Sequence, residues 1–148
     1  MGVRILLLGS GAREHAILST LLAEGAAHDI TVAPGNAGMA EVATTIGLDP
    51  ENPKIIAQFA ADNDIELVII GPEAPLVAGV ADALKRRRIP VFGPTTAAAQ
   101  LESSKSFAKR VMDAANIPTG LAALASTIDE VAGALDEFGA PYVVKADG

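Results

Sequence analysis

Short apolar runs that alternate with helix-patterned segments constrain the fold of this chain more than any other feature. Each run ends at a turn that contains glycine or proline, and the runs span residues 3–8, 30–32, 67–70 and 91–92. Between the runs, apolar residues recur at helical spacing, as in Ile17, Leu18, Leu21 and Leu22. Buried strands that alternate with amphipathic helices form βαβ units and a parallel sheet. We therefore predict an α/β fold over about residues 1–93, with helices on both faces of a parallel sheet.

The remaining residues predict a second, smaller unit. A helical stretch is expected at residues 97–115, followed by an extended segment at 117–119 and a short strand–helix–strand unit. The last strand of that unit is expected at residues 142–144. Because the sequence stops four residues later, with no partner element to cover this strand, we expect the unit to be incomplete. The predicted domains are residues 1–101 and 102–148.

Composition and charge argue against several classes of function. The formal net charge of −7 disfavours a nucleic-acid surface, which requires a basic stripe. The one basic run, residues 85–88, is expected to close a helix, where cations complement the carbonyl end. The chain has no cysteine, and His15 and His28 are too few for a metal site built by the protein. No apolar run is long enough for a membrane span or a signal peptide, and we expect a cytoplasmic protein.

The turn at residues 9–14 joins the first predicted strand to the first predicted helix. Its glycines allow the backbone to approach a ligand, and the N–H groups at a helix start attract an anion such as phosphate. A dinucleotide-binding fold is the competing interpretation. Glu14 stands where that fingerprint has its third glycine, and the ribose-binding acid is absent near residues 33–34. A tight turn without any ligand stays open as a third interpretation.

Turns of unusual chemistry follow all four predicted strands, at residues 9–11, 34–36, 71–73 and 93–95. In an open parallel sheet, ligands bind outside the carboxyl ends of the strands. Glu73 follows a buried strand there, so its carboxylate could accept hydrogen bonds from sugar hydroxyls. A phosphate at the helix start together with hydroxyls at Glu73 predicts a phosphorylated sugar as the ligand.

Several stretches, in order along the chain, form a familiar set: residues 9–16, 33–38, 71–76, 92–94, 98–107, 117–119 and 144–148. This set resembles the glycinamide ribonucleotide synthetase family, also called phosphoribosylamine–glycine ligases, of the ATP-grasp superfamily. Two of the stretches, Arg13-Glu14-His15 and the Gly-Pro-Glu-Ala-Pro-Leu run at 71–76, separate this family from related carboxylases and transformylases. The resemblance covers the whole chain without a visible gap.

The resemblance implies a ligase of de novo purine biosynthesis. In that family, ATP phosphorylates the carboxylate of glycine, and the amine of 5-phosphoribosylamine attacks the resulting glycyl phosphate to give glycinamide ribonucleotide, ADP and phosphate. The implied fold is a Rossmann-like pre-ATP-grasp domain followed by the truncated start of an ATP-grasp domain. Magnesium would bridge the ATP phosphates, with its ligands in a later part of the family's chain.

The resemblance also assigns residues. Lys105 and Lys145 match lysines that reach ATP phosphates. The glycine turn matches the phosphate site, Glu73 the ribose site, and the loop at residues 34–36 lies nearby in the family. The substrate-binding residues expected are Gly9, Gly11, Ala12, Arg13, Glu14, Pro34, Gly35, Asn36, Gly71, Pro72 and Glu73. No catalytic residue is assigned.

This sequence departs from the family in its length. The family's chain continues with a second glycine-rich loop over ATP and with the acids that hold magnesium, so we expect this chain to be an N-terminal fragment that is inactive alone. The full enzyme is expected to be a monomer that does not bind nucleic acid or a membrane. The alternatives are a Rossmann-like nucleotide- or dinucleotide-binding module without ligase activity, and a remnant without ligand affinity.

Overall fold

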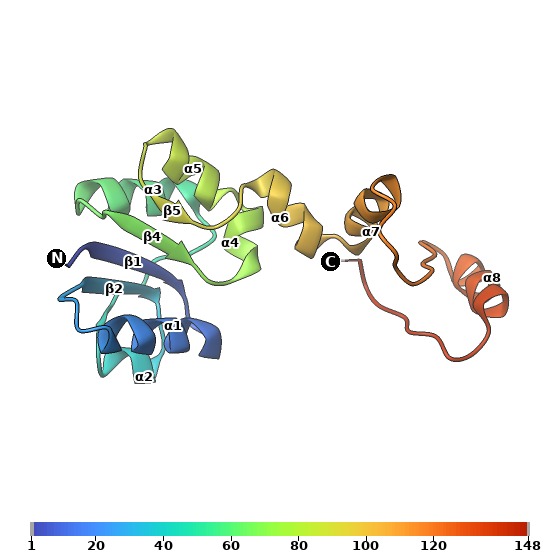
Figure 1. Cartoon of the computed structure of the whole chain (residues 1–148), viewed down its shortest axis with the longest axis horizontal. Coiled ribbons are helices and arrows are strands. Elements are labelled where there is room, and N and C mark those ends of the chain that lie inside the picture. The colour runs from blue at the N-terminus through green and yellow to red at the C-terminus, as the bar shows by residue number, and fades with distance from the viewer. Residues whose placement is uncertain (1, 148) are drawn as a thin grey trace. The chain divides into compact units, whose positions relative to one another are not determined.

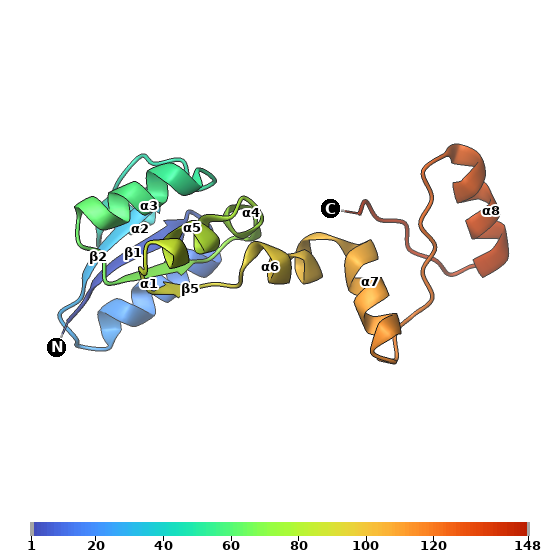
Figure 2. The same cartoon turned by 90° about the horizontal axis from the view of Figure 1, so that it is seen from above.

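A computed structural model describes residues 2–147 of the chain (Figures 1 and 2). Its contacts divide the chain into two compact units, one up to Ala99 and the other from Gln100 onward. The helix α6 (Thr96–Ser103) carries the chain from the first unit into the second. The two units are described separately below.

The first unit is built on a five-stranded sheet in the order β3-β2-β1-β4-β5. All neighbouring strands pair in parallel, which confirms the predicted α/β fold. The strands are β1 (Arg4–Gly9), β2 (Asp29–Pro34), β3 (Thr44–Thr45), β4 (Leu67–Ile70) and β5 (Val91–Phe92). Because β1 is the central strand and the chain order reverses between β2 and β4, the crevice of this sheet lies at the carboxyl end of β1.

Helices cover both faces of this sheet (Figure 1). Their bounds are α1 (Ala12–Ala23), α2 (Ala37–Ala40), α3 (Pro53–Asp62), α4 (Glu73–Val77) and α5 (Val80–Arg86). Side chains alternate along β1, so Leu6 and Leu8 pack with α3, α4 and α5, whereas Ile5 and Leu7 pack with α1 and α2. All four are buried, which explains why β1 is a continuous apolar run in the sequence.

Helix ends follow the signals in the sequence. The Asn52 side chain caps α3 by accepting a hydrogen bond from the N–H of Ile55 at 3.2 Å, and Pro53 occupies its first turn. Lys85 and Arg86 lie in the last turn of α5, as predicted for the basic run. The longest of the helices, α1, has 12 residues, and no helix within residues 2–147 is long and apolar enough to cross a membrane.

Two predicted helices are each divided in the structure. Leu76, Val77, Val80 and Leu84 recur at helical spacing and predict one helix, but the structure breaks it at Gly79. The φ of Gly79, +92°, is left-handed and lets the chain turn between α4 and α5. The stretch expected at residues 97–115 forms α6 and then α7 (Lys105–Ala114). Ser104 separates them, because its side chain caps α7 by accepting a hydrogen bond from the Phe107 N–H at 3.1 Å.

The second unit contains α7 and α8 (Ile128–Phe138). None of the residues of these two helices, all described by the structure, is buried. The predicted strand at residues 142–144 is wrong: the structure describes these residues and assigns them to no strand. A strand needs a neighbour to pair its backbone groups, and Val143 remains 79% exposed.

Candidate functional site

Three loops meet at the carboxyl edge of the sheet, after β1, β2 and β4. Since β2 and β4 flank β1 in parallel, their following loops are neighbours of the glycine turn. Backbone hydrogen bonds continue the pairing to the loops: the Gly35 N–H donates to the Gly9 carbonyl at 3.1 Å, and the Gly71 N–H donates to the Leu8 carbonyl at 3.1 Å. The structure thus brings together three of the four turns that the sequence marked, at residues 9–11, 34–36 and 71–73.

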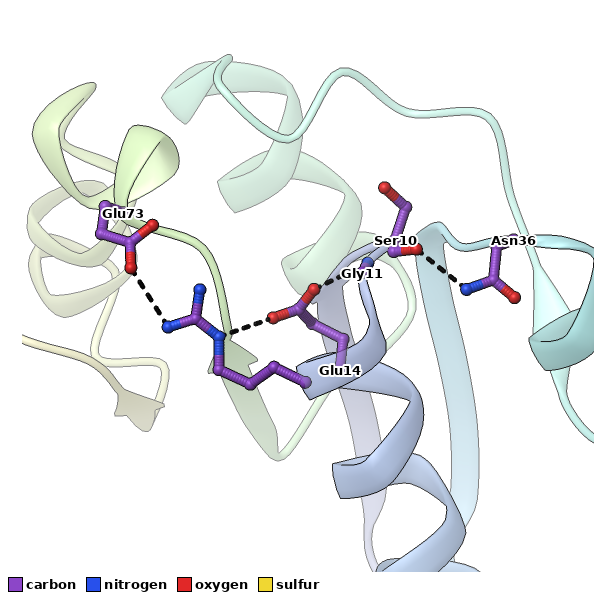
Figure 3. A network of polar contacts seen from close by, with 6 residues as sticks. Ser10, Gly11, Glu14, Asn36 and Glu73 are labelled. Atoms are coloured by element: carbon purple, nitrogen blue, oxygen red, sulfur yellow. Dashed lines mark hydrogen bonds and ion pairs between the residues drawn. The ribbon is translucent and has the colours of Figure 1, made fainter.

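Glu14 is the buried charge of this edge (Figure 3). It is 3% exposed, and its Oε2 accepts a hydrogen bond from the Gly11 N–H at 2.8 Å, which caps the start of α1. One of the N–H groups expected to meet a ligand anion is therefore occupied by a side chain of the protein itself. A carboxylate at this end of a helix also complements the helix dipole.

The glycines around Glu14 make room for its side chain. A Cβ built on Gly11 would lie 3.0 Å from Oε2 of Glu14, and one on Gly9 would lie 2.8 Å from the same atom. A Cβ on Gly71, at the end of β4, would overlap the Glu14 side chain outright. These glycines were predicted to let a ligand approach the backbone. The structure adds a second reason for them, which is the accommodation of a buried carboxylate from α1.

Arg13 links the glycine turn to the loop after β4. Its Nε lies 3.3 Å from Oε1 of Glu14, and its Nη1 donates to Oε1 of Glu73 at 3.1 Å. Hydrogen bonding from its own backbone N–H, and then from the Arg13 guanidinium, lowers the pKa of Glu73 below its ordinary value. Glu73 is therefore ionised at neutral pH, and its side chain remains 43% exposed.

Asn36 holds the third loop. Its Nδ2 donates to the Ser10 carbonyl at 2.8 Å (Figure 3). Its Oδ1 accepts from the Met39 N–H at 3.0 Å and caps α2. Gly35 has a φ of +73°, which turns the chain out of β2 after Pro34. The sequence marks Asn36 as a candidate site residue but indicates no structural role for it. The role depends on a contact with the Ser10 carbonyl, which no local pattern reveals.

A ribose-binding acid of the dinucleotide type is not supplied by β2. This strand ends at Pro34, and its acidic residue, Asp29, lies at its first position, at the opposite edge of the sheet. His28 also lies near that opposite edge, where its Nδ1 accepts a hydrogen bond from the Val3 N–H at 3.2 Å. These positions agree with the sequence argument against a dinucleotide fold.

Lys105 and Lys145 both belong to the second unit and are exposed. The segment that carries Lys145 reaches the start of α7, where Asp147 accepts hydrogen bonds from the Ser106 N–H and Oγ, each at 2.7 Å. These hydrogen bonds, and then the charge of Lys105, lower the pKa of Asp147. Among residues 2–147, no group of three or more His, Cys, Asp or Glu side chains could hold a metal ion.

Comparisons with known proteins agree with one another. Residues 3–102 match the family model described as "Phosphoribosylglycinamide synthetase, N domain". The chain is 67% identical over 147 residues to a phosphoribosylamine–glycine ligase of Leifsonia xyli, and 49% identical over 146 residues to one of Streptomyces coelicolor. Each alignment covers 99% of this chain but 35% of the relative, so the chain spans about a third of the length of these relatives.

A solved structure resembles the chain as well. The crystal structure of a phosphoribosylamine–glycine ligase from Thermotoga maritima aligns with a TM-score of 0.73 at 33% sequence identity. The alignment covers 99% of this chain and 33% of that one. The similarity therefore extends through both units of the chain, beyond the residues that the family model matches.

Proposed function

Because the chain belongs to the phosphoribosylglycinamide synthetase family, we propose that it supplies the 5-phosphoribosylamine-binding part of an ATP-dependent ligase that makes glycinamide ribonucleotide. The relatives named phosphoribosylamine–glycine ligase, of which this chain spans 35%, support the reaction. One observation carries the assignment to this edge of the sheet: the Arg13–Glu73 contact and the Asn36–Ser10 hydrogen bond join the three loops that bear the family's motifs.

The phosphate of 5-phosphoribosylamine is proposed to bind at the start of α1 and on the guanidinium of Arg13. The Gly11 N–H is engaged by Glu14, so Arg13 supplies the main positive charge for the phosphate at this place. Ionised Glu73 is proposed to accept hydrogen bonds from the ribose hydroxyls. The neighbouring residues Ala12, Gly71 and Pro72 are proposed to line the same site.

The second unit is proposed to begin the ATP site. Lys105 and Lys145 would reach phosphate oxygens of ATP, where ammonium groups neutralise charge. The carboxylate of glycine is a poor electrophile. In the complete reaction, ATP converts it into an acyl phosphate, which the amine then attacks. Positioning and charge neutralisation are the chain's share of that chemistry. Residues 2–147 hold no cluster of His, Cys, Asp or Glu side chains that could bind the magnesium ion. A cytoplasmic location and a monomeric full enzyme stay predictions from the sequence.

A titration followed by two-dimensional NMR tests the proposed site. Glycinamide ribonucleotide, the stable product, should shift the amide signals of residues 9–14 and 71–73 in the 148-residue chain. NAD serves as the competing ligand in a parallel titration. Shifts produced by NAD at these residues, without shifts from glycinamide ribonucleotide at millimolar concentration, would overturn the proposal in favour of a dinucleotide-binding module.

A further inference from the structure

Arg13 is shared by two carboxylates that differ sharply in their freedom to move. Glu14 is 3% exposed, is held by the Gly11 N–H, and is enclosed by Gly9 and Gly71. Glu73 has a side chain that is 43% exposed, at the start of the five-residue helix α4. Glu14 is therefore a fixed partner of Arg13, whereas Glu73 can leave the guanidinium by a rotamer change into solvent.

The two carboxylates beside Arg13 oppose the binding of a simple anion to its guanidinium. Glu14 and Glu73 both lie against the Arg13 guanidinium, so an incoming phosphate meets a carboxylate there unless one of them moves away. Burial prevents Glu14 from moving, since its side chain would lose the Gly11 hydrogen bond and the contact with Arg13 together. The carboxylate that leaves must be Glu73.

We infer that Glu73 is an exchangeable counterion of Arg13 that makes the site selective for ligands carrying both an anion and hydrogen-bond donors. The ligand's anionic group takes the place of Glu73 on the guanidinium, and the released carboxylate accepts hydrogen bonds from hydroxyl or ammonium groups of the same ligand. A single ligand can reach both groups, because Arg13 Nη1 and Glu73 Oε1 now lie 3.1 Å apart. The inference rests on the proposed function and adds a rule of specificity to it: phosphorylated sugars bind and bare phosphate does not.

This selectivity combines attraction with repulsion. The hydroxyls of a sugar phosphate donate hydrogen bonds to the displaced Glu73 carboxylate and so replace its contact with the guanidinium. Inorganic phosphate has no sugar hydroxyls to replace that contact. Discrimination between related ligands commonly depends on such an uncompensated charge as well as on favourable contacts. Removal of the charge of Glu73 should therefore improve the binding of the simple anion and weaken that of the sugar phosphate.

The test compares D-ribose 5-phosphate and inorganic phosphate on the 148-residue chain, with affinities from NMR titration. Glu73→Gln should bind inorganic phosphate about tenfold more tightly than the natural chain does, and ribose 5-phosphate several-fold less tightly. Glu73→Asp keeps the charge and should leave phosphate binding close to that of the natural chain. Glu137→Gln, which removes an exposed carboxylate from α8, is the matched control for the change in net charge.

The outcomes separate this inference from the proposed function. If ribose 5-phosphate binds but Glu73→Gln leaves inorganic phosphate binding unchanged, the counterion exchange is wrong and the proposed site stands. If Glu73→Asp improves phosphate binding as much as Glu73→Gln does, side-chain geometry and not charge is responsible, and the inference is again wrong. If neither ligand binds the natural chain or the variants, both the site and the inference are overturned.

Discussion

Gly71 and Glu14 depend on each other at the scale of single residues. The three heavy atoms nearest to a Cβ built on Gly71 all belong to Glu14. The backbone of Gly71 is not among those with positive φ, so an alanine there is opposed by the packing of Glu14 and not by its own conformation. The glycine is thus explained by a buried side chain that lies 57 positions earlier in the sequence.

A double-mutant cycle measures this dependence. Gly71→Ala alone should lower the free energy of unfolding by about 2 kcal/mol, because the added methyl group overpacks the site. In the background of Glu14→Ala the same substitution should cost less than about 0.5 kcal/mol, since the obstacle is gone. Gly47→Ala is the control, because no heavy atom lies within 4 Å of its built Cβ. Equal costs in both backgrounds, measured by urea denaturation, would contradict the packing of Glu14 described here.

At the scale of elements, Asp82 joins α5 to the start of α6. Its Oδ2 accepts hydrogen bonds from the Thr96 hydroxyl at 2.6 Å and from the Thr96 N–H at 2.9 Å. The hydroxyl and then the N–H hold the pKa of Asp82 below its ordinary value of 3.8. These two hydrogen bonds hold the loop after β5 against α5.

The hydrogen bonds of Asp82 predict that the stability of the chain depends on pH. Because the folded pKa of Asp82 is lowered, its contribution is fully present above the ordinary pKa of 3.8 and is lost as pH falls through the lower folded value. Asp82→Asn should therefore cost about 1 kcal/mol of unfolding free energy at pH 7, and the difference should shrink as the pH approaches ~2. Asp62→Asn, at an exposed position on α3, should show a smaller effect at pH 7. If the difference in unfolding free energy between Asp82→Asn and the natural chain stays constant down to pH ~2, the charge of Asp82 is not involved.

The elements also show how far the sequence could predict this structure. Apolar runs identified four of the five strands, and β4 has the predicted bounds of residues 67–70, because burial on both faces leaves a continuous apolar run. β3 consists of two threonines, so no apolar run marks it, and α2 has only four residues, too few for helical periodicity to appear. The strand expected at residues 142–144 has the right composition but no neighbour to pair with, which composition cannot reveal.

The candidate site was predictable in its loops and not in its contacts. The glycine and proline turns marked the carboxyl edge of the sheet, because a parallel topology brings strand ends together. The hydrogen bond from the Gly11 N–H to Glu14 and the contact of Arg13 with Glu73 follow from side-chain positions across the edge. A pattern that explains Glu14 as a missing glycine cannot show that the same residue is a buried cap.

At the scale of the whole molecule, burial is concentrated in the first unit. Every buried apolar residue described belongs to residues 5–99, whereas Leu121 and Ile128 of the second unit are each 88% exposed. Local stability follows the number of buried apolar contacts. The two units should therefore open with very different free energies.

Native-state amide exchange should resolve this difference. The amides of β1 and β4 should exchange only through global unfolding, and those of α8 should exchange with little protection.

A matched pair of substitutions tests the same difference in stability between the two units. Leu7→Ala should lower the unfolding free energy by about 2–4 kcal/mol, because Leu7 is fully buried. Leu135→Ala, on the poorly buried α8, should change the same transition by less than about 0.5 kcal/mol. Equal protection of α8 and β1, or equal costs of the two substitutions, would mean that the second unit is part of the same cooperative core.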